Sequence, residues 1–384
     1  MRLITARKVF LLVIGLYLLA CGLLLRRSKV ASVLKEEGND AEVANRAEGG
    51  DDETAMSDAG STIDDEHEQG LAAVADDIAV VADKSMPNRA LTNPEKSNLE
   101  ESMSWDEVQA ARKKVLWNVC KKQPQLNVNM TWIIHEHKRW LWPFIYNDEH
   151  RLIYCYVSKI ASTNWKSAFL VLMGKYKRVE DVKGSRAHDP SLPKLSKLQP
   201  EEIEFRLKNY TKFLFVRDPL SRALSGYRSK FLQPNRAFQK GIGRRIIQTY
   251  RQNPDPESLK TGKDVTFPEF AKYLTNAKPA KMDGHWKPIH DMVLPCGVNF
   301  DYIGKLETGH RDSVNILKRA HVDHLVYFKE STRNVSHDES VFHSFFDQLG
   351  PEHIKGLYKQ YELDFKLFDY TLPENMRPWV FGKR

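Results

Sequence analysis

Two short apolar runs in the middle of the chain each lead into a polar loop and then into a segment with helical spacing. The runs cover residues 152–157 and 213–216, and their length and their aromatic and β-branched content predict buried strands. The loops that follow begin at Ser158 and Arg217. Repeated strand–loop–helix units predict an α/β layered domain with a mainly parallel central sheet flanked by helices. Ligands of such sheets bind at the carboxyl ends of the strands.

Apolar residues at helical spacing recur on both sides of these units. Residues 105–122 predict a helix with Ser104 as its N-cap, and residues 201–207 predict another that Pro200 introduces. Residues 341–349 and 354–368 predict two late amphipathic helices. All eight tryptophans lie at or after Trp105. We therefore expect the folded domain to comprise residues 105–384.

The amino-terminal end has the pattern of a membrane anchor. Residues 9–25 are seventeen uncharged, mostly apolar positions with basic residues on both sides, which is near the lower limit for a spanning helix. A cleaved signal peptide is the alternative. However, the run is long for that role, and Arg26 and Arg27 follow where small residues would be expected. We expect residues 1–8 to be a short cytoplasmic tail.

Three N-glycosylation sequons lie after the apolar run, at Asn129, Asn209 and Asn334. Glycans are added in the secretory lumen, so these sequons favour a type II orientation with a lumenal domain.

An acidic segment separates the apolar run from the folded domain. Residues 36–83 hold sixteen Asp or Glu against one basic residue, Arg46, and residues 26–104 have few large apolar side chains. Such a segment buries too little apolar surface to offset its chain entropy, which predicts a flexible stem. From Lys84 onward, fifty Lys or Arg face thirty-four Asp or Glu. This basic body favours polyanionic partners, but the anchor and the sequons argue against nucleic acid.

Cysteine usage predicts one disulfide and no metal site. Cys21 falls inside the apolar run, which leaves Cys120, Cys155 and Cys296 for the folded domain. One pair and one free thiol fit this number, and the sequence does not say which pair. Zinc-type Cys and His spacings are missing from the sequence, so we expect no metal.

The first loop has the composition of an anion cradle. Lys159 supplies a cation, and the hydroxyls of Ser162 and Thr163 lie at the predicted start of a helix, where exposed N–H groups and the helix dipole favour phosphate. The GxxxxGK[ST] spacing of nucleoside triphosphatases is not present. An ordinary surface loop is the competing interpretation. The candidate ligand-binding residues of this loop are Ser158, Lys159, Ile160, Ala161, Ser162, Thr163 and Asn164.

The second loop repeats this arrangement after the second strand. Arg217 and Ser225 are candidates to clamp a second phosphate, and Pro219 suits the first turn of a helix. Tyr227 and Phe231 fit the helix core better than a ligand contact, and Lys230 fits a solvated helix charge as well as a ligand. The candidate residues of this loop are Arg217, Asp218, Pro219, Leu220, Ser221, Arg222, Ala223, Leu224 and Ser225, with Arg222 also open to the solvated interpretation.

The two loops together resemble the phosphosulfate-binding and 3'-phosphate-binding signatures of Golgi carbohydrate sulfotransferases. Over about residues 105–373 the chain is most similar to the chondroitin 4-O-sulfotransferase branch of the HNK-1 family. Besides the loops, the similarity rests on His285-Trp286, Pro295-Cys296, Tyr302-Ile-Gly-Lys-Leu-Glu307-Thr308 and Tyr361-Glu-Leu-Asp364-Phe365-Lys-Leu-Phe368-Asp-Tyr370. Three positions depart from the family pattern: Ser158 replaces a usual Pro, and Ser162 and Val293 each replace a common Cys.

The resemblance implies a P-loop-like sulfotransferase fold that uses 3'-phosphoadenylyl sulfate as donor, without a metal. It also implies a Golgi membrane location and a glycosaminoglycan acceptor, with the 4-position of N-acetylgalactosamine in chondroitin as the expected hydroxyl. Dermatan, N-glycan N-acetylgalactosamine and glucuronate remain alternatives, as does an inactive glycan-binding protein with the same fold. The oligomeric state is open.

Within this resemblance, two histidines are candidates for the acceptor side of the reaction. His188 lies between the two loop motifs, where sulfotransferases commonly place their catalytic base, and a histidine takes up a proton near neutral pH. A polar loop residue is the alternative for His188. Lys159 is expected to stabilise the leaving group. His285 is the second candidate for the base, although binding of substrate or local packing is the expectation that we favour for it. Glu307 is expected to be structural, through pairing with Lys305 or Arg311.

Overall fold

The computed structural model describes residues 100, 102–329 and 339–382. The apolar run at residues 9–25, nearly all of the acidic segment and the sequon at Asn334 lie outside these ranges. Contacts divide the chain into two units, and the fold given below is that of the unit formed by Val81–Pro279 and Asp283–Arg384. Within the described ranges, no helix combines the length and the hydrophobicity needed to cross a membrane.

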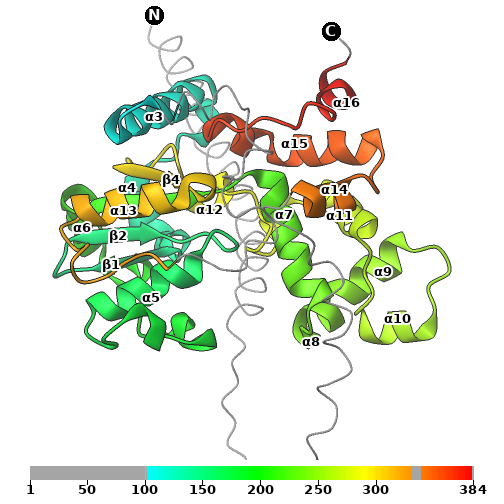
Figure 1. Ribbon diagram of the computed structural model, residues 1–384, viewed down its shortest axis with the longest axis horizontal. Helices are drawn as coiled ribbons and strands as arrows, with labels where there is room; N and C mark the ends of the chain where they lie inside the picture. The colour runs from blue at the N-terminus through cyan, green and yellow to red at the C-terminus, as the bar shows by residue number, and fades with distance from the viewer. Residues whose placement is uncertain (1–99, 101, 330–338, 383–384) are drawn as a thin grey trace, which may run out of the picture. The chain divides into compact units, whose positions relative to one another are not determined.

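A four-stranded sheet lies at the centre of this unit and is flanked by helices (Figure 1). The strands are β1 (Phe144–Asn147), β2 (Leu152–Cys155), β3 (Thr211–Val216) and β4 (Tyr302–Lys305), in that spatial order. β1 pairs antiparallel with β2, whereas β2–β3 and β3–β4 are parallel. The expected mixed α/β architecture with a mainly parallel sheet is therefore confirmed. The strand expected at residues 152–157 ends two residues earlier, at Cys155.

The described ranges contain the following α-helices. They are α3 (Trp105–Lys122), α4 (Met130–Glu136), α5 (Ser162–Leu172), α6 (Pro200–Asn209), α7 (Pro219–Tyr227), α8 (Arg236–Phe238), α9 (Arg244–Tyr250), α10 (Pro256–Thr261), α11 (Phe267–Asn276), α12 (His290–Val293), α13 (Gly309–Arg319), α14 (Glu339–Phe346), α15 (Pro351–Leu367) and α16 (Arg377–Phe381).

The local signals for helix starts are confirmed. Ser104 caps α3 in a capping box, in which its hydroxyl accepts from the Glu107 N–H while the Glu107 carboxylate accepts from the Ser104 N–H. Pro200 is the first residue of α6. The two late helices are observed as α14 and α15. Helix α14 begins two residues and ends three residues before the expected bounds, and α15 begins three residues and ends one residue before them.

An aromatic core joins α5 to the sheet. The Trp165 ring from α5 lies 4.7 Å from the Phe213 ring of β3, and Tyr154 of β2 stacks 5.1 Å from Phe213. A Cβ on Gly304 of β4 would lie 2.5 Å from the Phe215 ring, so glycine is required for this ring to cross the neighbouring strand. This packing fixes the start of α5 relative to the ends of the strands.

Helix α3 covers the open edge of β4. The Gln109 side chain both accepts from the Ile303 N–H and donates to the Ile303 carbonyl, and Arg112 donates to the same carbonyl. Arg112 also forms a buried 2.7 Å ion pair with Asp312 of α13. Unpaired backbone groups at a sheet edge invite association with other chains, and these side chains satisfy them within the domain.

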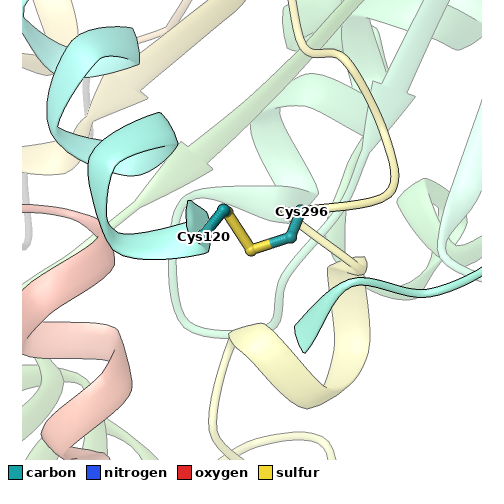
Figure 2. Close-up of a disulfide and its surroundings, with 2 residues drawn as sticks. All are labelled: Cys120 and Cys296. Atoms are coloured by element: carbon teal, nitrogen blue, oxygen red, sulfur yellow. A yellow bond between two sulfur atoms is a disulfide. The ribbon is translucent and has the colours of Figure 1, made fainter. Parts of the chain in front are cut away.

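The disulfide joins Cys120, at the end of α3, to Cys296 (Figure 2). Their Cα atoms are 5.5 Å apart and 176 positions separate them along the chain. Cys155 is a free, buried cysteine at the end of β2. The pairing that the sequence left open is therefore decided by which chain segments the fold brings together.

Candidate functional site

The loop between β2 and α5 has a backbone conformation that L-residues rarely adopt. Lys159 has φ +70° and Ala161 has φ +52°, both in the left-handed region. Ala161 is the N-cap of α5 and provides no side-chain cap to the first turn of this helix. The N–H groups at the start of α5 are therefore oriented to receive an anion. Strained backbone of this kind is characteristic of ligand-binding loops.

Two arginines connect the second loop to the backbone of the first. Arg217 directly follows β3 and donates from Nη1 to the Lys159 carbonyl at 3.1 Å. Arg222 of α7 donates from Nε to the Ser158 carbonyl at 3.2 Å. Both side chains are buried, with 2% and 1% exposed surface. The two loops predicted from sequence thus form one structure, and the arginines hold the strained loop in place.

The interpretation of Arg222 as a solvated helix charge is wrong. Besides the Ser158 carbonyl, it donates to the carbonyls of Lys287 at 2.7 Å and Gly284 at 2.8 Å. All three acceptors are backbone groups on two different segments. A planar guanidinium with five N–H donors suits such a junction. Arg222 therefore positions the loop and the 284–287 segment rather than acting as a free ligand for phosphate.

Cations gather around Lys159. Burial, together with the positive charges of Lys230, Arg217 and Arg222, lowers the pKa of its ammonium to about 8. Burial likewise lowers the pKa of Arg217 to about 10. Lys230 lies on a π-helical segment, η6 (Arg228–Leu232), that continues α7, and its Nζ is 4.2 Å from the centre of the Phe238 ring. A bound anion would relieve the repulsion among these cations.

The remaining residues of the second loop are mostly structural. The Asp218 carboxylate caps α7 by accepting from the Ser221 N–H at 2.7 Å, and burial raises the pKa of Asp218 to about 6. Its own N–H donates to Glu307 at 2.8 Å. Ser225, a candidate for the second phosphate, lies two turns into α7 rather than among the free N–H groups at its start, and it is half-buried. Pro219 begins the helix, and packing positions are taken by Leu220, Ala223 and Leu224.

Glu307 is structural as expected, but with different partners. Its carboxylate accepts from the Asp218 N–H and from the Tyr370 hydroxyl at 2.8 Å, rather than pairing with Lys305 or Arg311. The motif around Glu307 therefore helps to position the second loop through the Asp218 backbone. The core positions of Tyr227 and Phe231 are confirmed, since 3% and 2% of their surfaces are exposed.

His285 lies close enough to Lys159 and Lys230 for their charges to affect its pKa. Burial lowers the pKa of this imidazole, and Lys230 and Lys159 lower it further, whereas Asp283 raises it. The Nδ1 atom of His285 is 2.6 Å from the Asp283 carboxylate. Since Nδ1 is held by the carboxylate, Nε2 is the nitrogen that can accept a proton. This carboxylate–histidine pair is the part of the site that the sequence did not reveal, because Asp283 belongs to no motif.

Helices α15 and α7 both contact the segment that carries His285. The Tyr361 hydroxyl of α15 donates to the Trp286 carbonyl at 2.6 Å, and Asp364 accepts from the Ile289 and His290 N–H groups at 2.6 and 2.9 Å. On α7, a Cβ at Gly226 would lie 3.2 Å from the His285 carbonyl. The late motif containing Tyr361 and Asp364 thus positions the histidine segment from a distant part of the chain.

The other sequence candidates lie as follows. His188 is exposed at the end of a 3₁₀ turn, η4 (Gly184–His188), which packs beside α5. Asn129 is exposed and caps α4, and Asn209 is the exposed last residue of α6. In the first loop, Ile160 is buried, whereas the other candidate residues retain some exposure. Over the described residues, no group of three or more His, Cys, Asp or Glu is placed to hold a metal ion.

Comparison with known proteins agrees with these features. Residues 142–371 match the family described as "Sulfotransferase family". Carbohydrate sulfotransferase 14 of Danio rerio is 38% identical over 267 residues, covering 69% of this chain and 72% of the relative. Carbohydrate sulfotransferase 11 of Rattus norvegicus is 37% identical, covering 61% and 68%. Carbohydrate sulfotransferase 8 of Mus musculus is 31% identical, covering 71% and 66%. No solved structure matches significantly.

The family match includes both loops, the histidine segment and the late motif with Tyr361 and Asp364. It extends over more than half of the chain, and the relatives that cover this region are carbohydrate sulfotransferases. The chain therefore belongs to the sulfotransferase family.

Proposed function

We propose that this protein transfers sulfate from 3'-phosphoadenylyl sulfate to a hydroxyl of a glycan. The observation that carries the proposal is the joining of two phosphate-type loops by Arg217 and Arg222, with Lys159 and Lys230 beside them. A donor with phosphate at both ends suits a site with two such loops. Membership of the sulfotransferase family supports the same donor and a P-loop-like sulfotransferase fold.

In the proposed complex, the 5'-phosphosulfate lies against Lys159 and the start of α5. The 3'-phosphate lies near Arg217 and Ser225. The acceptor hydroxyl attacks the sulfur, a new S–O bond forms, and the bond between sulfur and the bridging phosphate oxygen breaks. Lys159 stabilises the charge that develops on this oxygen, which remains on 3'-phosphoadenosine 5'-phosphate. The proton of the hydroxyl passes to a histidine base.

Two histidines are candidates for this base. His188 was expected from its place between the motifs, and His285 was expected to bind substrate. The pairing of His285 with Asp283, and its electrostatic coupling to Lys159 and Lys230, favour His285 as the base, with Asp283 as its positioning residue. The lowered pKa keeps His285 neutral, and therefore basic, near neutral pH.

For the acceptor we propose chondroitin, at the 4-position of N-acetylgalactosamine, in a type II Golgi membrane protein. This assignment rests on the motif resemblance and on the basic body of the chain, which suits a uronate-bearing glycan. Incubation of the full chain with labelled donor and unsulfated chondroitin, followed by disaccharide analysis, tests it. We expect 4-sulfated disaccharides. Labelled product only on dermatan, an N-glycan or glucuronate would refute the chondroitin assignment.

A glycan-binding protein without activity is the alternative of another class, because Ser158 replaces the usual Pro of the first loop. Calorimetry with 3'-phosphoadenosine 5'-phosphate separates the two, since a purely glycan-binding protein would bind no nucleotide.

Lys159→Ala and Arg217→Ala should each abolish transfer, with a loss of about 100-fold or more. Lys114→Ala, on the exposed face of α3, is the matched control. Full activity in either site variant would refute the proposed site.

A further inference from the structure

A cavity of about 370 Å³ lies beside the disulfide, between α3 and the segment that leads into β4. Its lining includes Cys120, Cys296, Phe300 and Ile303. Phe300 and Ile303 lie at the amino end of β4, whereas Lys305 at its other end pairs with Val216, next to Arg217. The cavity is therefore at the opposite end of this strand from the donor loops, and no residue of those loops lines it.

One face of α3 gives this cavity a basic and aromatic wall. Lys113, Trp117 and Lys121 all line the cavity, and their spacing of four residues places them in one row on the helix. The Lys121 Nζ lies 4.2 Å from the centre of the Trp117 ring. Trp117 is 62% exposed, the largest exposed fraction among the large hydrophobic side chains of the described residues. Single exposed apolar side chains are common on protein surfaces, whereas apolar surface that continues into a pocket is typical of a binding site.

The opposite side of the cavity is closely packed and includes two amide side chains. Gly297 is packed so closely that a Cβ there would lie 2.4 Å from Val128, and the disulfide fixes the neighbouring Cys296 to α3. Asn127 and Asn299 add amide groups to the lining. Among the described residues that line the cavity, none is acidic. A preformed cavity of this kind loses little conformational freedom when it binds a ligand.

We propose that this cavity binds an acidic sugar unit of the glycan, away from the hydroxyl that is sulfated. The apolar face of the sugar ring would lie against Trp117, and its carboxylate or sulfate would pair with Lys113 and Lys121. The amides of Asn127 and Asn299 would bond its hydroxyls. This inference rests on the proposed function, since it takes the ligand to be another part of the same acidic chain. The cavity would thereby favour long acceptors over short ones.

Direct binding tests the site without catalysis. Fluorescence or calorimetric titration of the full chain with an unsulfated chondroitin dodecasaccharide, in the absence of donor, gives the affinity. We expect Trp117→Ala and the double variant Lys113→Gln/Lys121→Gln each to weaken binding by about tenfold. Carboxyl-reduced chondroitin should bind to the wild type as weakly as unmodified chondroitin binds to these variants. Chemical sulfation of the reduced chain should restore the affinity, because sulfate can take the place of the carboxylate.

Two matched controls separate a site from a general basic surface. Lys114→Gln/Lys122→Gln removes the same charge from the same helix, at exposed positions that do not line the cavity. Trp132→Ala removes another exposed tryptophan, 40% exposed on α4. We expect each control to change the affinity by less than about twofold. Equal losses in control and cavity variants, or no loss in the cavity variants, would overturn the proposal.

Kinetics distinguish this inference from the proposed function. With long chondroitin, Trp117→Ala should raise KM with little change in kcat, and transfer to a tetrasaccharide should be unaffected. A fall in kcat on both acceptors would place Trp117 at the reacting site and overturn the inference. If the wild type transfers sulfate to no glycan, the proposed function fails, whereas the binding titration still decides whether the cavity takes an acidic sugar.

Discussion

At the residue scale, the candidate site contains basic side chains whose charged forms are disfavoured by burial. Lys159 lies in a left-handed backbone conformation with its ammonium partly removed from water and close to other cations. The same backbone position exposes its carbonyl to Arg217. Both features are costly without a ligand, and an anion with several charges offsets the electrostatic part of this cost.

The affinity for nucleotide should depend on pH through Lys159. Its pKa of about 8 in the free protein means that it loses its charge as the pH rises through 8. An anion stabilises the charged form, so binding above pH 8 must take up a proton and should weaken by up to about tenfold per pH unit. Titration of 3'-phosphoadenosine 5'-phosphate between pH 7 and 9.5 measures this. Lys159→Arg keeps its charge and should flatten the dependence, whereas Lys114→Arg should not alter it.

The roles of His285 and Asp283 make a second prediction. His285→Gln should lower kcat by about 100-fold or more with nucleotide affinity retained. Asp283 raises the pKa of His285, so in Asp283→Asn the acidic limb of the pH–rate profile should move to lower pH. A merely structural Asp283 would lower activity without moving this limb.

His188→Gln provides the comparison for that experiment. If His285 is the base, His188→Gln should retain most of kcat and the wild-type pH profile. The reverse result, with a large kcat loss in His188→Gln and a small one in His285→Gln, would assign the base to the loop between the two motifs.

At the scale of elements, α7 acts as a brace between segments that are far apart in the sequence. Its Arg222 holds the loop before α5 and the segment that carries His285, while Asp218 caps its first turn. Helix α15 supports the same histidine segment through Tyr361 and Asp364. The loop before α5 and the segment that carries His285 are therefore positioned by hydrogen bonds between side chains of one element and the backbone of another.

Loss of the Arg222 side chain should affect both stability and the site. Arg222→Met leaves three carbonyls without their donor, so we expect the free energy of unfolding to fall by about 3 kcal/mol. Denaturant titration measures this, and hydrogen exchange should show faster exchange in residues 158–162 and 284–290. Arg228→Met, six residues further on and half-buried, is the control and should change stability by less than about 1 kcal/mol. Unchanged exchange in both segments would contradict the bracing role.

At the scale of the whole domain, contacts between residues far apart in the sequence hold α3 against β4. The Cys120–Cys296 disulfide spans 176 positions and ties α3 to the segment before β4, and the side chains of Gln109 and Arg112 bind the edge of the same strand. Closing so long a chain segment reduces the entropy of the unfolded state. Helix α3 is thereby held against the edge of β4.

Removal of the disulfide should lower stability more than activity. Cys120→Ala/Cys296→Ala should reduce the free energy of unfolding by about 2–5 kcal/mol, as measured by denaturant titration. Nucleotide affinity should change by less than about threefold, because the two loops that begin at Ser158 and Arg217 lie at the other end of the strand. Cys155→Ala, which removes the free thiol, controls for the loss of sulfur. A large fall in nucleotide affinity would show that the two ends of the sheet are coupled.

Much of the fold and part of the site were predictable because they depend on local pattern. The capping box at Ser104, the start of α6 at Pro200 and the central strands follow from residues that are neighbours in sequence. The positions of Lys159 and Arg217 followed from the order of strand and loop. The boundaries of the strand at residues 152–157 and of the two late helices were less accurate, because strand ends depend on the partner strand and helix ends on packing.

The sequence by itself determined the mixed α/β domain, the positions of the two candidate loops and their family resemblance, since these rest on local spacing and residue type. Only the tertiary structure decided the cysteine pairing, the bracing role of Arg222, the partners of Glu307 and the pairing of His285 with Asp283. Most of these features join segments separated by tens of residues or more, and even Asp283, two residues from His285, belongs to no motif. Their energies depend on burial and on hydrogen-bond geometry, which arise only when the chain is folded.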